Sequence, residues 1–121
     1  MTAYEIPPYM TAAEETFYRL MCDKGIRLDF IGHNHASKFA LNARYSLNSK
    51  TYKPDFHLPG TTVYYEVIGS RCAFYAGKQK YLRFRELYPN LTLHVVTANG
   101  ISIDLTQPLQ QAHLQEARMH G

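Results

Sequence analysis

Apolar and polar residues follow a helical spacing near the start of the chain and a strand-like alternation directly after it. Residues 11–14 (Thr-Ala-Ala-Glu) have the pattern of a helical capping box, and apolar residues then recur at helical spacing up to Met21. Gly25 is expected to end this helix. From residue 26 to residue 30, apolar residues alternate with charged ones, which predicts a half-buried strand. Residues 33–51 are polar and basic, and strand, short helix and loop all stay open for them.

The centre of the chain predicts a β-hairpin. Residues 53–58 and 62–68 are its two expected strands, and they flank a Pro-Gly pair. A two-residue turn at Gly60-Thr61 and a four-residue loop over 59–62 give the same register. Pro59 has no N–H to donate beside a tight turn, which favours the longer loop. In either case Asp55 lies directly opposite Glu66.

The second half of the chain predicts a long helix followed by a buried strand. The helix runs from about residue 71 to residue 87, and Pro89 ends it. Gly77 lies on its apolar stripe, where we expect it to allow close approach of the helix backbone to a sheet. Residues 91–97 are rich in Leu and Val and predict the buried strand. The alternation at residues 101–105 predicts an edge strand, and a short helix is expected from Pro108 to about residue 119.

Length and composition limit the possibilities further. A chain of 121 residues is expected to form a single α/β domain with a central mixed sheet flanked by helices. No stretch is apolar for long enough to span a membrane, and the first residues do not resemble a signal peptide, so we expect a cytoplasmic, intracellular protein. Cys22 and Cys72 have no metal-ligand spacing and are both expected to be buried thiols in a reducing compartment.

Charge is distributed very unevenly along the chain. Between Phe30 and Arg85 there are nine lysines and arginines, but Asp55 and Glu66 are the only acidic residues. Such a basic segment indicates a polyanionic partner. The cations that we expect to contact nucleic-acid phosphates are Lys38, Arg44, Lys50, Lys53 and Arg71.

The two isolated carboxylates predict a divalent metal site. Like charges that face each other across a sheet are destabilising, and a shared cation is the simplest way to offset that cost. Mg²⁺ prefers hard oxygen ligands, commonly one or two carboxylates together with water and substrate phosphate. The alternative is a pair of surface carboxylates on an ordinary hairpin.

The residues around this pair resemble a known motif. Pro54-Asp55, ten intervening residues and then Glu66-Val67-Ile68 resemble the PD-(D/E)XK nuclease superfamily, and the predicted elements from residue 11 to residue 97 match its αβββαβ restriction-endonuclease-like core. The segment 66–71 and the basic helix after it are similar to small endonucleases of phages and mobile introns. The resemblance implies that Asp55 and Glu66 bind Mg²⁺, with the backbone carbonyl of Val67 as a third ligand and Mn²⁺ as a substitute ion.

Two positions need separate treatment. Glu14 is either only a member of the capping box or the metal-associated glutamate that the family often has on this helix. Ile68 stands where the family has lysine. The resemblance implies that a cation on the following helix replaces this lysine, and the candidates are Lys78 and Lys80, with Arg71 and Gln79 as weaker choices.

Other polar residues carry less information. His33-Asn34-His35 contains the letters of an HNH nuclease, but three adjacent residues are more typical of a loop. His57 shares a face with Asp55 and fits a structural or rim role better than metal binding. Tyr45 and Tyr52, among basic residues, are expected to be structural, with stacking on bases as the alternative.

These observations predict an Mg²⁺-dependent endonuclease that hydrolyses phosphodiester bonds in double-stranded DNA, and a homing endonuclease is the most specific form of this prediction. A homodimer or homotetramer is expected, with residues 98–121 as a C-terminal extension available for assembly. The first alternative is a non-catalytic nucleic-acid-binding protein that retains the nuclease fold. The second is a small protein-interaction module.

Overall fold

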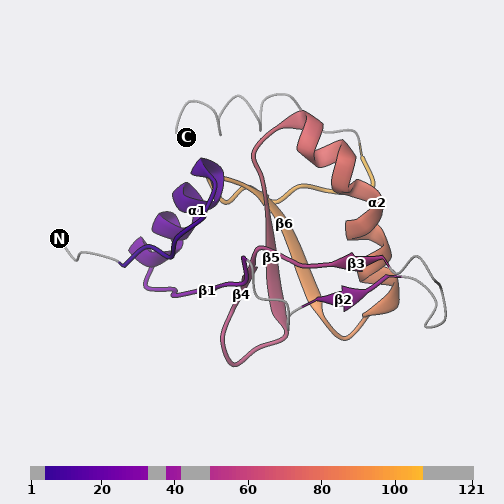
Figure 1. Ribbon diagram of the computed structural model, residues 1–121, viewed down its shortest axis with the longest axis horizontal. Coiled ribbons are helices and arrows are strands. Elements are labelled where there is room, and N and C mark those ends of the chain that lie inside the picture. Colours follow the sequence, from indigo (N-terminus) through magenta and orange to yellow (C-terminus); the bar gives the residue numbers. More distant parts are fainter. Residues whose placement is uncertain (1–4, 33–37, 42–49, 108–121) are drawn as a thin grey trace.

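The computed structural model describes residues 5–32, 38–41 and 50–107, and Figure 1 shows their arrangement. Two helices lie on opposite sides of a four-stranded mixed sheet, and a separate two-stranded hairpin packs beside the second helix. The helices are α1 (Ala12–Asp23) and α2 (Arg71–Leu87). The sheet has the order β1 (Asp29–Phe30), β4 (Phe56–His57), β5 (Val63–Ile68) and β6 (Thr92–Thr97), and the hairpin consists of β2 (Phe39–Ala40) and β3 (Thr51–Tyr52).

The ends of α1 follow the sequence signals. The Thr11 hydroxyl accepts a hydrogen bond from the Glu14 N–H at 3.2 Å, and the Glu14 carboxylate accepts one from the Thr11 N–H at 2.7 Å, which confirms the capping box. At the other end Gly25 has a φ of +80°. The N–H groups of Gly25 and Ile26 bond to the carbonyls of Cys22 and Met21, which forms a Schellman motif.

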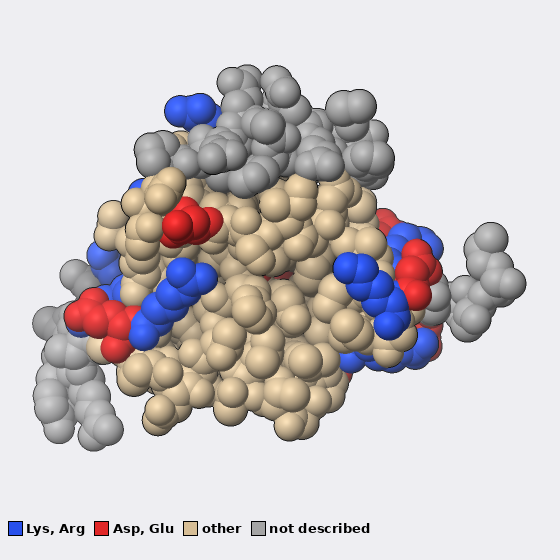
Figure 2. All heavy atoms as spheres, turned by 180° about the vertical axis from the view of Figure 1, so that it is seen from behind, with Lys and Arg blue, Asp and Glu red and all other residues tan. Residues whose placement is uncertain are grey.

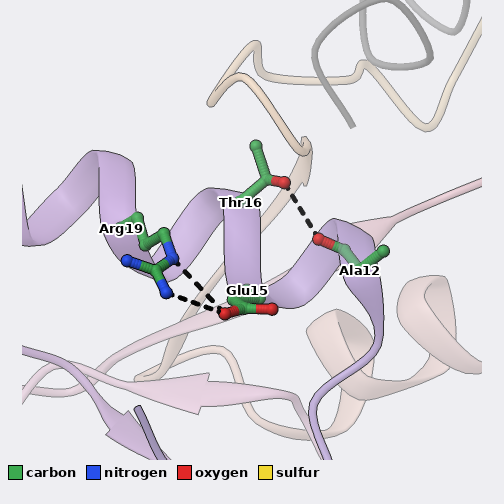
Figure 3. A network of polar contacts seen from close by, with 4 residues as sticks. All are labelled: Ala12, Glu15, Thr16 and Arg19. Carbon is green, nitrogen blue, oxygen red and sulfur yellow. Dashed lines mark hydrogen bonds and ion pairs between the residues drawn. The ribbon is translucent and has the colours of Figure 1, made fainter. Parts of the chain in front are cut away.

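The exposed face of α1 carries its own polar contacts, shown in Figure 3. Arg19 pairs with Glu15 at 3.0 Å, and the Thr16 hydroxyl donates to the Ala12 carbonyl at 2.9 Å. Glu14, by contrast, is only 9% exposed. The two adjacent glutamates therefore differ in role: Glu15 is a surface charge, while Glu14 is turned toward the interior.

The register predicted for the central hairpin is confirmed. Phe56 pairs with Tyr65 and His57 with Tyr64, and the Leu58 N–H donates to the Val63 carbonyl across the four-residue loop. Gly60, within that loop, has a φ of +77°, which favours glycine.

Two of the predicted strands are shorter than expected. Only Phe56–His57 of residues 53–58 and Asp29–Phe30 of residues 26–30 form strand. Beside β4, the Val67 N–H donates to the side chain of Asp55 and not to a main-chain carbonyl. At the start of residues 26–30, the Ile26 N–H donates to the Met21 carbonyl at the end of α1. In both places a local hydrogen bond ends the ladder.

The second half of the chain matches its prediction closely. α2 begins after Ser70, whose hydroxyl accepts a hydrogen bond from the Ala73 N–H at 3.0 Å, and it ends before Pro89. β6 pairs in parallel with β5 along six residues. The expected edge strand at 101–105 is reduced to a single antiparallel bridge between Val96 and Ser102. The helix expected from Pro108 lies outside the described residues.

Side chains from the two faces of the sheet form two hydrophobic clusters. On the α1 side, Phe17 and Tyr18 pack against Phe56 and Val67. On the α2 side, Phe74 and Phe84 are fully buried with strand and hairpin residues. Because alternate strand residues point to opposite faces, this arrangement puts Glu66 on the α2 face, between the Tyr65 and Val67 that face α1.

The β2–β3 hairpin is attached to α2 by aromatic packing and hydrogen bonds. The ring of Phe39 makes edge contacts with Phe84 and Tyr88 at centroid distances of 5.0 and 5.2 Å. The Tyr88 hydroxyl donates to the Ala40 carbonyl at 2.9 Å, and Arg83 Nε donates to the Leu41 carbonyl at 3.2 Å. The segment that the sequence left open thus contains two very short strands.

Two sequence expectations are wrong in detail. Cys22 is buried, but Cys72 is exposed at the start of α2. The space beside Gly77 is occupied by the ring of Tyr81 from the next helical turn, not by the sheet backbone.

Among the described residues, no helix is long and apolar enough to cross a membrane.

Gly77→Ala should destabilise the protein, although alanine is the better helix former. In an exposed helix this change stabilises by up to about 1 kcal/mol. Here the new Cβ would overlap the buried ring and hydroxyl of Tyr81, which would have to move. Thermal unfolding should therefore show a lower midpoint for Gly77→Ala than for the wild type. An increased midpoint would contradict this packing.

Candidate functional site

Asp55 and Glu66 come together as the register predicted. Asp55 immediately precedes β4, and Glu66 lies in β5. Both side chains are partly buried, and each carboxyl group affects the pKa of the other. The two groups therefore take up and release protons as a pair.

The protein also supplies a hydrogen-bond donor to each carboxyl group. The Val67 N–H donates to Asp55 Oδ2 at 2.8 Å, and the buried Tyr52 hydroxyl donates to Glu66 Oε1. Tyr52 reaches the site from β3, so the hairpin takes part directly in holding Glu66. The stacking role considered for Tyr52 does not fit this position, because its side chain is only 7% exposed and packs against Tyr81.

Glu14 joins this group from α1. Its charge and a hydrogen bond to Asp55 both raise the pKa of Asp55. Glu14 therefore belongs to the capping box and to the acidic site at once, and the two interpretations of the sequence do not exclude each other.

Burial and mutual repulsion perturb the acidic pair strongly. Desolvation, followed by the charges of Glu66 and Glu14, raises the pKa of Asp55 well above its usual value, while the Val67 N–H lowers it. Desolvation also raises the pKa of Glu66 from 4.5 to about 7, although the hydrogen bonds from Tyr52 and Asp55 act in the opposite direction. Buried groups perturbed by specific charged neighbours are characteristic of functional sites.

Lys80, and not Lys78, is the helix lysine that lies next to the pair. Its charge lowers the pKa of Glu66, and it lines a pocket of about 410 Å³ together with Glu66, Lys53 and Tyr52. Lys78 is partly buried elsewhere on α2 and lines neither this pocket nor the adjoining one. Ile68 is 1% exposed within the α2-side cluster and has no polar role.

The 410 Å³ pocket continues into a larger one of about 690 Å³, and together they form a groove between the β2–β3 hairpin and α2. Thr51, Ala76 and Lys80 line both parts. The larger part is also lined by Leu41, Lys50, Gln79 and Arg83. Arg83 is exposed on α2, and only the position of the hairpin places it in the groove.

The other predicted phosphate contacts lie away from the groove. Lys38 is exposed just before β2. Arg71 is exposed at the start of α2, with its guanidinium 5.4 Å from the ring centre of Tyr75. Arg44, Tyr45 and the His33-Asn34-His35 triplet lie outside the described residues. His57 Nε2 is 2.7 Å from the Thr61 carbonyl in the hairpin loop, which agrees with a structural role.

Lysine and arginine do not cover the molecule evenly. Figure 2 shows the molecule from behind, where residues of other kinds fill the middle of the face and the basic residues stand toward its two sides. Four cations line the groove: Lys50 and Lys53 on the hairpin side, and Lys80 and Arg83 on α2.

The donor set fits a hard divalent cation. Among the described residues no three His, Cys, Asp or Glu side chains are grouped so that they could hold a metal ion, so Glu14 lies near Asp55 without completing a three-carboxylate metal site. The side-chain ligands would thus be Asp55 and Glu66, which agrees with the preference of Mg²⁺ for one or two carboxylates completed by other oxygens. Val67 contacts the site through its N–H, and coordination by its carbonyl stays a prediction.

The chain was also compared with protein-family models, curated proteins and solved structures, and none of them matches it.

In the absence of divalent ions, the protein should lose stability as pH rises from about 4.5 to about 7. The raised pKa of Glu66 means that the folded state keeps a proton that the unfolded state releases in this range, so the free energy of unfolding falls. Glu66→Gln should flatten this dependence in thermal unfolding with EDTA. Tyr52→Phe should extend the loss to higher pH, because the Tyr52 hydroxyl lowers the pKa of Glu66. Identical pH profiles for the wild type and Glu66→Gln would contradict the assignment.

Proposed function

We propose that the protein is a metal-dependent endonuclease that hydrolyses phosphodiester bonds in DNA, with an active site at Asp55 and Glu66. The observation that supports this proposal most strongly is the partly buried acidic pair, whose Glu66 lines a pocket together with two lysines. The arrangement combines a place for a hard cation with positive charge for a phosphate.

Asp55 and Glu66 would hold Mg²⁺ or Mn²⁺. When bound, such an ion supplies positive charge to the phosphate and makes a bound water more acidic. The Val67 N–H and the Tyr52 hydroxyl each bind one oxygen of a carboxyl group, which would hold both groups in position for the ion.

Lys80 would act as the cation that the PD-(D/E)XK motif places at the position of Ile68. Lys80 lies on α2 and lines the same pocket as Glu66. In this position it would stabilise negative charge on a phosphate that undergoes attack. Lys53, from the opposite wall, would hold a neighbouring phosphate oxygen.

Double-stranded DNA as partner, a homodimer or homotetramer, and a homing role belong to the same proposal. A single small domain offers limited surface for sequence-specific recognition, which favours assembly of two or more copies. The main alternative is a non-catalytic nucleic-acid-binding protein. The departure from the family motif at Ile68 favours this alternative, whereas the position of Lys80 favours catalysis.

Asp55→Asn should abolish cleavage of plasmid DNA in Mg²⁺ or Mn²⁺ and yet raise thermal stability at pH 8 in EDTA. The amide still offers an oxygen to the Val67 N–H but removes one of two repelling charges. Asp29→Asn is the matched control, because Asp29 is an exposed acid on β1, and it should cleave normally. Nicking by Asp55→Asn at the wild-type rate would refute the active-site assignment. DNA binding without any cleavage by the wild type would favour the non-catalytic alternative.

Lys80→Met and Lys78→Met should separate the two helix lysines. Methionine retains much of the apolar stem but removes the charge. Loss of a single group that stabilises transition-state charge typically costs about a hundredfold or more in kcat, and we expect this for Lys80→Met. Lys78→Met should change kcat little, since Lys78 does not line the pocket. The reverse result in single-turnover kinetics would transfer the role to Lys78.

A further inference from the structure

We propose that the groove between the β2–β3 hairpin and α2 binds one unpaired strand of nucleic acid and leads its backbone to the acidic pair. The preferred substrate would then be unpaired at the position of cleavage. The claim that the strand is cleaved at the acidic pair rests on the proposed function. The claim that the groove binds a strand does not.

The dimensions of the groove suit a few nucleotides of a single strand. Its two parts have volumes of about 690 and 410 Å³, and the residues of α2 that line it extend from Ala73 to Arg83. Ten residues of helix at a rise of 1.5 Å correspond to a length of about 15 Å. Glu66 lies at one end of this path, where only the smaller part reaches it.

Both walls of the groove carry positive charge. Lys50 and Lys53 come from the hairpin side, and Lys80 and Arg83 come from α2. Lys53 and Lys80 line the end near Glu66, while Lys50 and Arg83 line the other end. An extended strand along the groove would thus meet cations on both sides over its whole length, as in other sites that follow a single-stranded backbone.

The walls are too firmly joined to admit a duplex. Arg83 of α2 and Tyr88, which directly follows α2, donate hydrogen bonds to the Leu41 and Ala40 carbonyls at 3.2 and 2.9 Å. The major groove of B-DNA is about 12 Å wide and accommodates a whole α-helix, so the duplex itself is wider still. The protein groove, whose two walls are joined by these hydrogen bonds, is too narrow to hold it. A double-stranded DNA substrate would therefore have to be unpaired at the cleaved position, so that one strand enters the groove while the paired parts stay outside it.

Fluorescence anisotropy in EDTA tests the binding step without cleavage. The probes are a labelled short oligodeoxythymidylate, the matching oligoribonucleotide and a blunt duplex of equal length, with the full chain. We expect the single strands to bind at least about tenfold more tightly than the duplex. Four phosphate contacts predict a slope of about −3 for the logarithm of the binding constant against the logarithm of the salt concentration, and Lys50→Ala should reduce it by about 0.7. The two oligonucleotides show whether the sugar matters.

Ala76→Glu places a carboxylate in the groove and tests its location. Ala76 is exposed on α2 and lines both parts of the groove, so a folded variant with about tenfold weaker binding of single strands is expected. Thr92→Glu is the control with the same charge change, since Thr92 is exposed on β6 away from the groove. Lys50→Ala is a second, milder variant if Ala76→Glu does not fold.

The outcomes separate this inference from the proposed function. Equal binding of duplex and single strands, or an unchanged affinity in both Ala76→Glu and Lys50→Ala, would overturn the groove. Selective single-strand binding without cleavage in Mg²⁺ or Mn²⁺ would support the groove and reject the nuclease. Faster cleavage of a duplex with an unpaired bubble than of a fully paired duplex would support both.

Discussion

The partial burial of the facing carboxyl groups of Asp55 and Glu66 is the main energetic constraint on this structure, and the neighbouring residues are arranged to reduce its cost. The rise in the pKa of Glu66 from 4.5 to about 7 corresponds to roughly 3 kcal/mol at about 1.4 kcal/mol per pKa unit. That is a large fraction of the roughly 5–15 kcal/mol by which folded domains are stable. Packing does not require these charges, since apolar residues would fill the same space at lower cost. Such a pair is best understood as the cost of a function.

The neighbouring donors reduce this cost without removing it. A main-chain N–H at Val67, a phenol at Tyr52 and an ammonium at Lys80 each favour the ionised form of one acid. Their combined effect still leaves both pKa values raised, because desolvation is the largest contribution for each carboxyl group. A divalent ion is the partner that would compensate two charges at once. The protein thus holds the pair in position while leaving it electrostatically incomplete.

The β2–β3 hairpin connects the acidic pair to the groove. Tyr52 reaches Glu66 from the buried side of β3, and the exposed residues beside it, Lys50 and Thr51, form one wall of the groove. The short segment of residues 50–52 therefore serves both purposes. Attachment of this strand to α2 through Phe39 and Tyr88 therefore fixes the acidic pair and the groove relative to each other.

The sequence determined some of these features and not others for physical reasons. Both helices end at local signals, such as the capping box at Thr11 and the stop at Pro89, so their bounds could be read directly. The facing of Asp55 and Glu66 followed from a short loop and strand alternation. The hairpin could not be predicted, because each of its strands has two residues and its packing depends on partners such as Phe84, distant in sequence. The choice between Lys78 and Lys80 depends on that same packing.

Tertiary packing also favours a cation on α2 over one at the position of Ile68. Ile68 is enclosed by the α2-side cluster at 1% exposure, so a lysine there would bury an ammonium group among apolar side chains. Lys80 avoids this cost, because it is exposed and reaches the pocket from the open side of α2. The same residue lines both parts of the groove. A cation on the helix can therefore act on the acidic pair and on a strand in the groove, which a buried strand lysine could not do.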